Sequence, residues 1–217
     1  MRLSRLLVAA ALLAVLLPAT VMAQRQGRAG DFDFYVLALS WSPSHCAAEG
    51  EGANRQQCGS GRAYGFVVHG LWPQYERGFP RECRTERRRV PERIVRTMLD
   101  IMPSGGLVGH QWRMHGTCSG LSQQDYFATV RAAREKVKIP QRFEGLAEEQ
   151  HIAPSVVESA FMKANPGLPE DGVSVSCEGR FMREVRICLT KDLQFRACGE
   201  LERRACSAAG LRMPPIR

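Results

Sequence analysis

Residues 63–74 read AYGFVVHGLWPQ and carry the clearest fold signal of the chain. The run Ala63–Val68 combines aromatic and β-branched residues, which predicts a buried β-strand. Gly70 and Pro73 predict that this strand stops shortly after it. His69 then stands at the end of a strand, where a polar ring faces either a cleft or the solvent. A lone histidine in such a place is more often a structural hydrogen-bonding residue.

A second histidine-containing stretch, HQWRMHGTC, occupies residues 110–118 and predicts one short helix. At about 100° per residue, one helix face carries His110, Gln111, Met114 and His115. Trp112 lies outside this face and can anchor the helix in the core, and Gly116 provides a stop. Paired histidines can bind zinc, but the metalloprotease pattern is i, i+4 with an intervening glutamate. Here the spacing is i, i+5 without one, which argues against a metal site.

The rest of the chain mixes helices and strands without a βαβ rhythm. Periodicity predicts strands at residues 32–41, 173–176 and 183–190 and helices at residues 91–101, 122–137 and 155–164. Pro91 fits the first turn of the first helix, and Ser122 with Asp125 forms a capping box for the second. Residues 50–62 predict a polar, glycine-rich loop. This mixture favours an α+β fold over a doubly wound sheet.

The N-terminus has the pattern of a secretory signal peptide. A basic start precedes the unbroken apolar run Leu6–Leu17, and Val21–Ala23 gives a small-x-small cleavage site. A membrane anchor is the alternative, but the run is shorter than the roughly 20 residues that a spanning helix needs. We therefore expect residues 1–23 to be removed, residues 24–217 to form one catalytic domain, and the protein to be periplasmic or secreted.

The chain has eight cysteines, all of them after residue 23, and a formal net charge of +8. An even number in an exported chain predicts four disulfides, although spacing alone leaves their pairing open. A zinc site would want closely spaced pairs such as C-x2-C, and the chain has none. The positive charge suits a polyanionic partner but equally suits simple solubility. The arginine-rich residues 81–89 are open to the same two interpretations, a solvated surface or a steering patch for RNA.

Two histidines from separate elements suit cleavage of RNA, in which the substrate supplies its own nucleophile. Imidazole titrates near neutral pH, so one ring can be neutral while another is charged. The neutral ring would take the proton of the 2′-hydroxyl, and the charged ring would protonate the departing 5′-oxygen. No metal is required. The rival hydrolases are disfavoured, because a serine esterase would need G-x-S-x-G and a cysteine protease a free thiol.

The sequence resembles the ribonuclease T2 family of acid and S-like endoribonucleases, in its bacterial branch. The resemblance rests on LALSWSP at residues 37–43, FVVHGLWPQ at 66–74 and HQWRMHGTC at 110–118, in the order and spacing of the family. It implies a disulfide-rich domain with a central, mainly antiparallel sheet flanked by helices. We expect a monomer that acts on single-stranded RNA without a cofactor, a metal or, after removal of the signal, a membrane.

The resemblance also implies a role for each residue of these motifs. His69 would be the general acid, His115 the general base, and His110 a group that positions the phosphate. The product would be a 2′,3′-cyclic phosphate, later opened to a 3′-phosphate. Trp72, which fits either the core or a stacking platform, matches a base-stacking position, and Gln74 lies at the base site. The implied disulfides are Cys46–Cys58, Cys83–Cys118, Cys177–Cys206 and Cys188–Cys198.

Two residues depart from the family pattern. The family usually has glutamate where Gln111 stands and lysine where Met114 stands, and these groups help to stabilise the charged pentacoordinate state. Gln111 keeps a hydrogen-bonding amide, but Met114 supplies neither charge nor donor, and losing one stabiliser costs on the order of 10²- to 10³-fold in rate. Arg113 points away from the catalytic face, so a residue of the 81–89 loop is the candidate replacement.

We therefore expect an active but weakened enzyme. The alternative is a catalytically impaired RNA-binding or inhibitory protein on the same fold. His45 and His151 have no motif around them and are interpreted as surface or structural residues.

Overall fold

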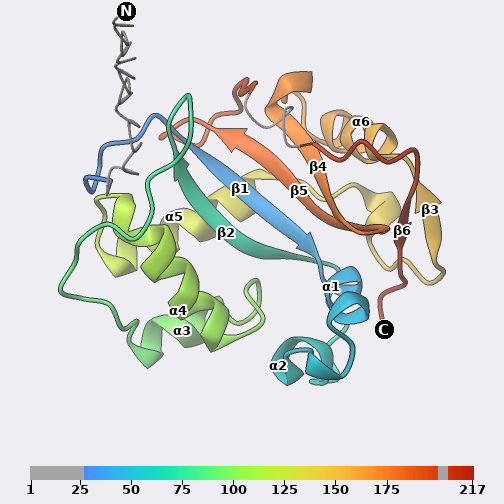
Figure 1. The fold of residues 1–217 in the computed structure, drawn as a ribbon, viewed down its shortest axis with the longest axis horizontal. Coiled ribbons are helices and arrows are strands. Elements are labelled where there is room, and N and C mark those ends of the chain that lie inside the picture. Colours follow the sequence, from blue (N-terminus) through green and yellow to red (C-terminus); the bar gives the residue numbers. More distant parts are fainter. Residues whose placement is uncertain (1–26, 200–204) are drawn as a thin grey trace, which may run out of the picture.

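The computed structural model describes residues 27–199 and 205–217, and the predicted signal peptide lies outside the described residues. Figure 1 shows a twisted sheet with helices around it. In chain order the elements are β1 (Phe34–Trp41), α1 (Ser42–Glu49), α2 (Arg55–Cys58), β2 (Phe66–Gln74), α3 (Glu92–Met98), α4 (Gly105–Met114), α5 (Gln123–Lys136), β3 (Gln150–Ile152), α6 (Pro154–Ala164), β4 (Val173–Glu178), β5 (Phe181–Leu189) and β6 (Leu211–Met213).

The six strands form one sheet in the order β2-β1-β5-β6-β3, with β4 paired to β5. The pairings are antiparallel except for a short parallel contact between β5 and β6. The predicted α+β fold with a central, mainly antiparallel sheet is therefore confirmed. No helix among the described residues combines the length and the apolar character needed to cross a membrane.

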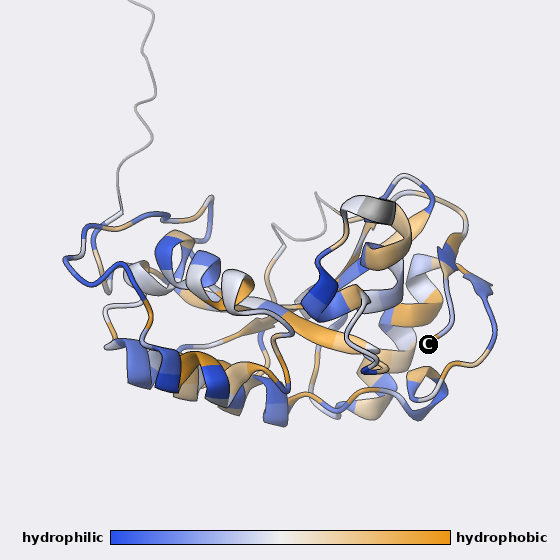
Figure 2. Cartoon of the chain, turned by 90° about the horizontal axis from the view of Figure 1, so that it is seen from below, coloured by the Kyte–Doolittle hydropathy of each residue, from blue (hydrophilic) through white to orange (hydrophobic). Residues whose placement is uncertain are grey.

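The core lies between the sheet and the helices on one of its faces. Alternate residues of β1 face this core, namely Tyr35, Leu37, Leu39 and Trp41. The helix α5 contributes Tyr126, Phe127 and Val130 from the other side. Figure 2 shows the helices against the sheet with much of their hydrophilic surface turned outward. The even-numbered residues of β1 point to the opposite face, which is where the candidate site lies.

The strand β2 is longer than predicted, and the expectation that His69 ends a strand is wrong. The strand continues to Gln74 because it is an edge strand, where Pro73 can be tolerated without a ladder hydrogen bond. The register changes between Leu39↔Val68 and Ala38↔Gly70, which leaves His69 as an extra residue in a β-bulge.

The bulge determines which side chains of β2 share a face. Val68 and Leu71 both belong to the core, although they are three positions apart and strict alternation would put them on opposite faces. Because His69 is the inserted residue, the residues after it alternate between the two faces again, with Leu71 facing the core. The result is that His69 and Trp72 both point away from the core, toward the same side of the sheet.

The histidine-containing helix also differs from the prediction. The helix α4 starts at Gly105, where the hydroxyl of Ser104 accepts a hydrogen bond from the N–H of Leu107 at 3.1 Å. It ends at Met114, and His115 is a non-helical residue with φ −127°. Gly116 then begins a 3₁₀ turn. Its lack of a side chain serves close packing, because a Cβ there would lie 2.5 Å from the Trp112 ring.

Most other predicted elements are confirmed with shifted ends. Ser122 caps α5 as predicted, accepting a hydrogen bond from the N–H of Asp125 at 3.2 Å. The helix α3 stops before the predicted residue 101, because the chain there turns so that the carbonyl of Ile101 accepts a hydrogen bond from Val68 on β2. The predicted loop 50–62 instead contains α2, and the helix α1 before it was not predicted.

Four disulfides join Cys46 to Cys58, Cys83 to Cys118, Cys177 to Cys206 and Cys188 to Cys198. These are the pairs that the resemblance implies. The second of them ties the 81–89 loop to the 3₁₀ turn that follows His115.

Candidate active site

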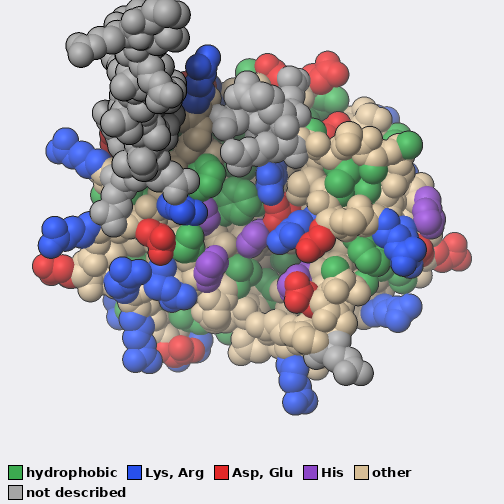
Figure 3. Space-filling view, viewed as in Figure 1, with side chains coloured by type: hydrophobic (Ala, Val, Ile, Leu, Met, Phe, Trp, Pro, Cys, Tyr) green, Lys and Arg blue, Asp and Glu red, His purple; other side chains and the backbone are tan. Residues whose placement is uncertain are grey.

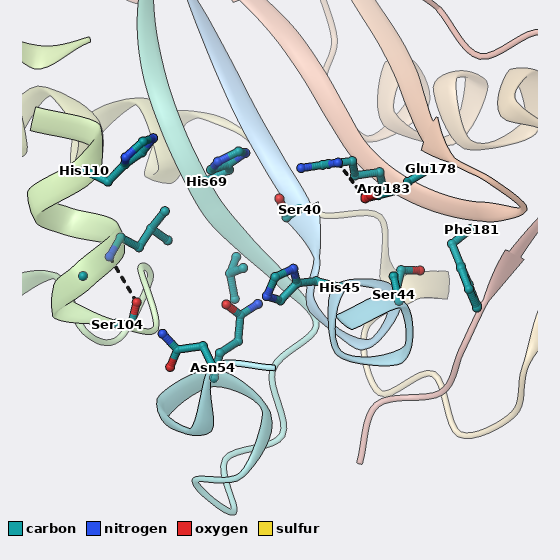
Figure 4. Close-up of a pocket in the computed structure, with 15 residues that line it drawn as sticks. Ser40, Ser44, His45, Asn54, His69, Ser104, His110, Glu178, Phe181 and Arg183 are labelled. Carbon is teal, nitrogen blue, oxygen red and sulfur yellow. Dashed lines mark hydrogen bonds and ion pairs between the residues drawn. The ribbon is translucent and has the colours of Figure 1, made fainter. Parts of the chain in front are cut away.

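A cavity of about 380 Å³ opens on the face of the sheet opposite to α5. Figure 3 shows histidine side chains gathered near the middle of this face, with acidic and basic side chains beside them. Figure 4 shows His110 of α4 and His69 of β2 on the same side of the cavity, with His45 of α1 below them. The lining thus combines two predicted site histidines with a third, His45, which sequence analysis placed on the surface or in a structural role.

His69 is oriented by a buried carboxylate. Its Nδ1 donates a hydrogen bond to Oε1 of Glu184 on β5. Glu184 is only 1% exposed, while His69 is 27% exposed toward the cavity. An ionised carboxylate can only accept, so Nδ1 carries a hydrogen, and Nε2 is left to exchange protons with a substrate.

Glu184 stays ionised although it is buried. Burial opposes ionisation, but the hydrogen bond and charge of His69, together with those of Arg186, outweigh it and lower the pKa of Glu184 to about 2. Arg186 donates two hydrogen bonds to Oε2, from Nε at 3.0 Å and from Nη2 at 2.9 Å. The hydroxyl of Ser40 donates a further one to Oε1 at 3.3 Å.

The indole of Trp72 lies close to both histidines of the proposed acid–base pair. Its ring centroid is 5.3 Å from that of His69 and 5.3 Å from that of His115. The guanidinium carbon of Arg186 lies 5.4 Å from the same ring. The structure therefore brings together His69, Trp72 and His115, which come from two separate stretches of sequence.

Gln111 connects β2 to α4. It is 1% exposed, and its Oε1 accepts a hydrogen bond from Nε1 of Trp72 at 2.8 Å. Gly70 lies directly beneath this bond, and a Cβ there would be 2.2 Å from Oε1 of Gln111 and 2.3 Å from Nε1 of Trp72. The glycine of the HGLW motif is thus required by the close approach of the helix to the strand.

His115 is held neutral by its surroundings. Burial, followed by the positive charges of His69 and His110, lowers its pKa from 6.5 to about 3. Its Nδ1 is enclosed and finds no hydrogen-bond partner among the described residues. His110, by contrast, is exposed; partial desolvation and the charges of Arg113 and His69 lower its pKa below the usual value.

Some residues singled out by sequence lie apart from this cluster. Gln74 is five residues along β2 from His69, roughly 15 Å at the rise of a strand, and its amide donates to the carbonyl of Pro73. Arg113 lines a separate hollow with Arg88 and Arg89. In residues 27–199 and 205–217, no three His, Cys, Asp or Glu side chains gather in a way that could hold a metal ion.

Sequence reasoning missed Glu184, Arg186 and His45. The first two lie on β5, whose EVR sequence reads as an ordinary strand with outward-facing polar residues. One signal was available, because a glutamate and an arginine in alternating positions of a central strand must share a face. Nothing in the sequence, however, says that this face is the one with His69.

Known proteins resemble this chain over most of its length. The model of the Ribonuclease T2 family matches residues 32–198. A ribonuclease of Aeromonas hydrophila is 41% identical over 173 residues, which cover 78% of this chain and 77% of that protein. Ribonuclease I of Escherichia coli strain K12 is 26% identical to this chain, and the alignment covers 84% of this chain and 86% of that protein.

The fold is also found among solved structures. The structure of RNase NT in complex with 5′-AMP superposes with a TM-score of 0.65 at 25% sequence identity. The superposition covers 86% of this chain and 100% of the RNase NT chain. The family match begins just before β1, runs through both histidine-containing stretches and ends at Cys198, the last cysteine to pair with β5. The chain therefore belongs to the ribonuclease T2 family.

Proposed function

We propose that this protein is an endoribonuclease that cleaves single-stranded RNA by transphosphorylation, through a 2′,3′-cyclic phosphate to 3′-phosphate ends, without a metal. The observation that carries the proposal is that His69 and His115 both lie close to Trp72, each with its ring centroid 5.3 Å from that of the indole. One ring is paired with a carboxylate and the other is kept neutral, which suits an acid and a base.

In the first step, His115 acts as the base. Its neutral ring takes the proton of the 2′-hydroxyl, and the 2′-oxygen attacks phosphorus. Since Nδ1 is enclosed, we infer that Nε2 meets the substrate. The bond from phosphorus to the 5′-oxygen breaks, and His69 protonates that oxygen from Nε2 while Glu184 keeps the ring in place. In the second step water replaces the 5′-hydroxyl and the two roles reverse.

The remaining groups bind and position the RNA. His110 stands at the cavity with its ring exposed, where it can contact a phosphate oxygen. The indole of Trp72 has His115 and Arg186 near it, at 5.3 and 5.4 Å from its ring centroid. We propose that Trp72 holds these side chains in place and stacks a base of the RNA, whose chain continues into the adjoining cavity.

We also propose that the protein works in the periplasm or outside the cell. The N-terminal pattern supports export, and four disulfides suit an oxidising compartment.

Cleavage in the presence of excess EDTA tests this function. The purified protein should convert a short RNA into fragments that first carry 2′,3′-cyclic phosphate ends and later 3′-phosphate ends. DNA of the same sequence should stay intact, because it lacks the attacking hydroxyl. Binding of RNA without fragments would instead favour an RNA-binding or inhibitory protein on the same fold.

We predict that the enzyme keeps its activity at acid pH. The base must be neutral to act, and a pKa of about 3 keeps His115 neutral down to that pH. At about pH 5 an ordinary histidine would be only about 3% neutral. The pH profile of kcat/KM, which reports the free enzyme, should therefore stay near its maximum at about pH 5. A fall by more than tenfold between about pH 7 and pH 5 would contradict the assignment of His115.

We predict that Met114→Lys raises kcat, by up to about tenfold, because a lysine adds positive charge near the developing pentacoordinate state. Gln124→Lys is the control, since it adds the same charge at an exposed position of α5 on the opposite side of the sheet. An unchanged or lower rate in Met114→Lys would argue against our interpretation of this position.

A further inference from the structure

Arg186 lies on the site face of β5 with a clear space beside it. In the sheet register it stands opposite Ala38 of β1, and Ala38 stands opposite Gly70 of β2. Directly paired residues point to the same face, and neighbouring strands are about 4.8 Å apart. The two positions between Arg186 and α4 thus carry only a methyl group and a hydrogen, so nothing blocks the arginine from reaching toward Trp72.

The guanidinium of Arg186 is held in a fixed orientation. Its Nε and Nη2 both donate to one oxygen of buried Glu184, and its carbon lies 5.4 Å from the Trp72 ring. The arginine side chain is 22% exposed. Its Nη1 makes no hydrogen bond within the described part of the chain. The Nε–Nη2 edge of the guanidinium is thus fixed by Glu184, and Nη1 keeps N–H donors that can bind a ligand.

The charge of this cluster favours an anion. Glu184 carries one negative charge, while Arg186 and a protonated His69 carry two positive charges in contact with it. The neighbouring Arg183 adds a further positive charge, since its Nη1 donates to Glu178 at 2.6 Å and its Nε lies 3.8 Å from Oε1 of Glu184. A preorganised positive group in a partly desolvated site stabilises negative charge that develops in a transition state.

We propose that Arg186 contacts a non-bridging oxygen of the reacting phosphate and stabilises the pentacoordinate state. It thereby supplies the positive charge that Met114 lacks. This inference rests on the proposed function and names an added catalytic residue for it. The 81–89 loop is the other candidate source of this charge, because the N–H of Glu82 donates to the carbonyl of Met114 at 2.9 Å.

Arg186→Gln is the first variant that tests this proposal. With a dinucleoside phosphate in excess EDTA, kcat should fall by about 10²- to 10³-fold while KM changes little. Adding Met114→Lys to this variant should recover part of the loss, and by a larger factor than Met114→Lys gains in the wild type. Arg131→Gln is the matched control, because Arg131 is also paired with a carboxylate, Asp100, but lies on α5 behind the sheet.

Phosphorothioate substrates distinguish the proposed contact with the phosphate from a purely structural role, in which Arg186 only neutralises Glu184. If Nη1 donates to one non-bridging oxygen, the two diastereomers should differ in kcat/KM in the wild type. That ratio should change in Arg186→Lys, which keeps a positive charge beside Glu184 and therefore keeps the fold, but not in Arg131→Gln. Melting temperatures confirm folding.

The outcomes are distinguishable. A folded Arg186→Gln with kcat within about twofold of the wild type, or a diastereomer ratio that Arg186→Lys leaves unchanged, overturns the role of Arg186 and leaves the proposed function in place. A wild-type protein that does not cleave RNA overturns the proposed function itself.

Discussion

His69→Ala and His115→Ala should each abolish detectable cleavage of RNA, a loss of at least about 10²- to 10⁴-fold, which is the range that a general acid or base contributes. Each ring is the proton carrier that we assign to its step. His69 is oriented by Glu184 toward the cavity, and His115 is kept neutral by burial. Initial rates on a dinucleoside phosphate, with circular dichroism to verify folding, provide the measurement.

His151→Ala is the matched control, because this histidine is 71% exposed and lies beside Glu149, away from the cavity. It should cleave like the wild type. His69→Asn adds a second test, since an amide N–H can still donate to Glu184 while no group remains to supply a proton. If either alanine variant retained a tenth of the wild-type rate, that histidine would lose its assigned role.

The sequence predicts the fold class better than it predicts the local geometry of the site. Alternating and helical periodicity found β1, α5, α6 and both late strands, because burial on one face leaves a regular pattern. The same periodicity did not predict the course of strand β2 beyond His69. A bulge breaks the alternation, and its cost or benefit depends on the partner strand β1 rather than on β2 itself.

Contacts outside the local sequence also explain why the helix α4 ends at Met114. On a helical wheel, His110 and His115 share a face, and the structure instead places His115 after the last helical residue. The turn there follows from long-range packing. Gly116 is pressed against Trp112 and Tyr126, and Cys118 is bonded to Cys83. Of these contacts, only the one between Gly116 and Trp112 falls within the nine-residue stretch, whereas Tyr126 and Cys83 lie outside it.

The partners of His69 were beyond the reach of local sequence for a different reason. Glu184 is 115 residues away, and only the register between β1 and β5 places it opposite Ser40 on the site face. A one-residue slip in that register would send Glu184 and Arg186 into the core. The chemistry of the site therefore depends on strand pairing as much as on the two histidine motifs.

Gly70→Ala should lower kcat by about 10²-fold and stability by about 1–3 kcal/mol, although it changes no group that takes part in the chemistry. The new methyl group would stand 2.2 Å from Oε1 of Gln111 and 2.3 Å from Nε1 of Trp72. Neither can move freely, because Gln111 is buried on α4 and Trp72 packs against His115. The helix must shift away from the strand.

Such a shift would move His115, which follows α4, relative to His69 on β2, and a misplacement of about 1 Å is enough for a loss of this size. Gly109→Ala is the control within the same helix. Its methyl group would meet only the flexible end of Arg113 at 3.1 Å, so activity should persist and stability should rise by about 0.5–1 kcal/mol. Urea unfolding measures the stability of both variants, and steady-state kinetics measures their kcat. Wild-type activity in Gly70→Ala would show that the contact between β2 and α4 does not align the two histidines.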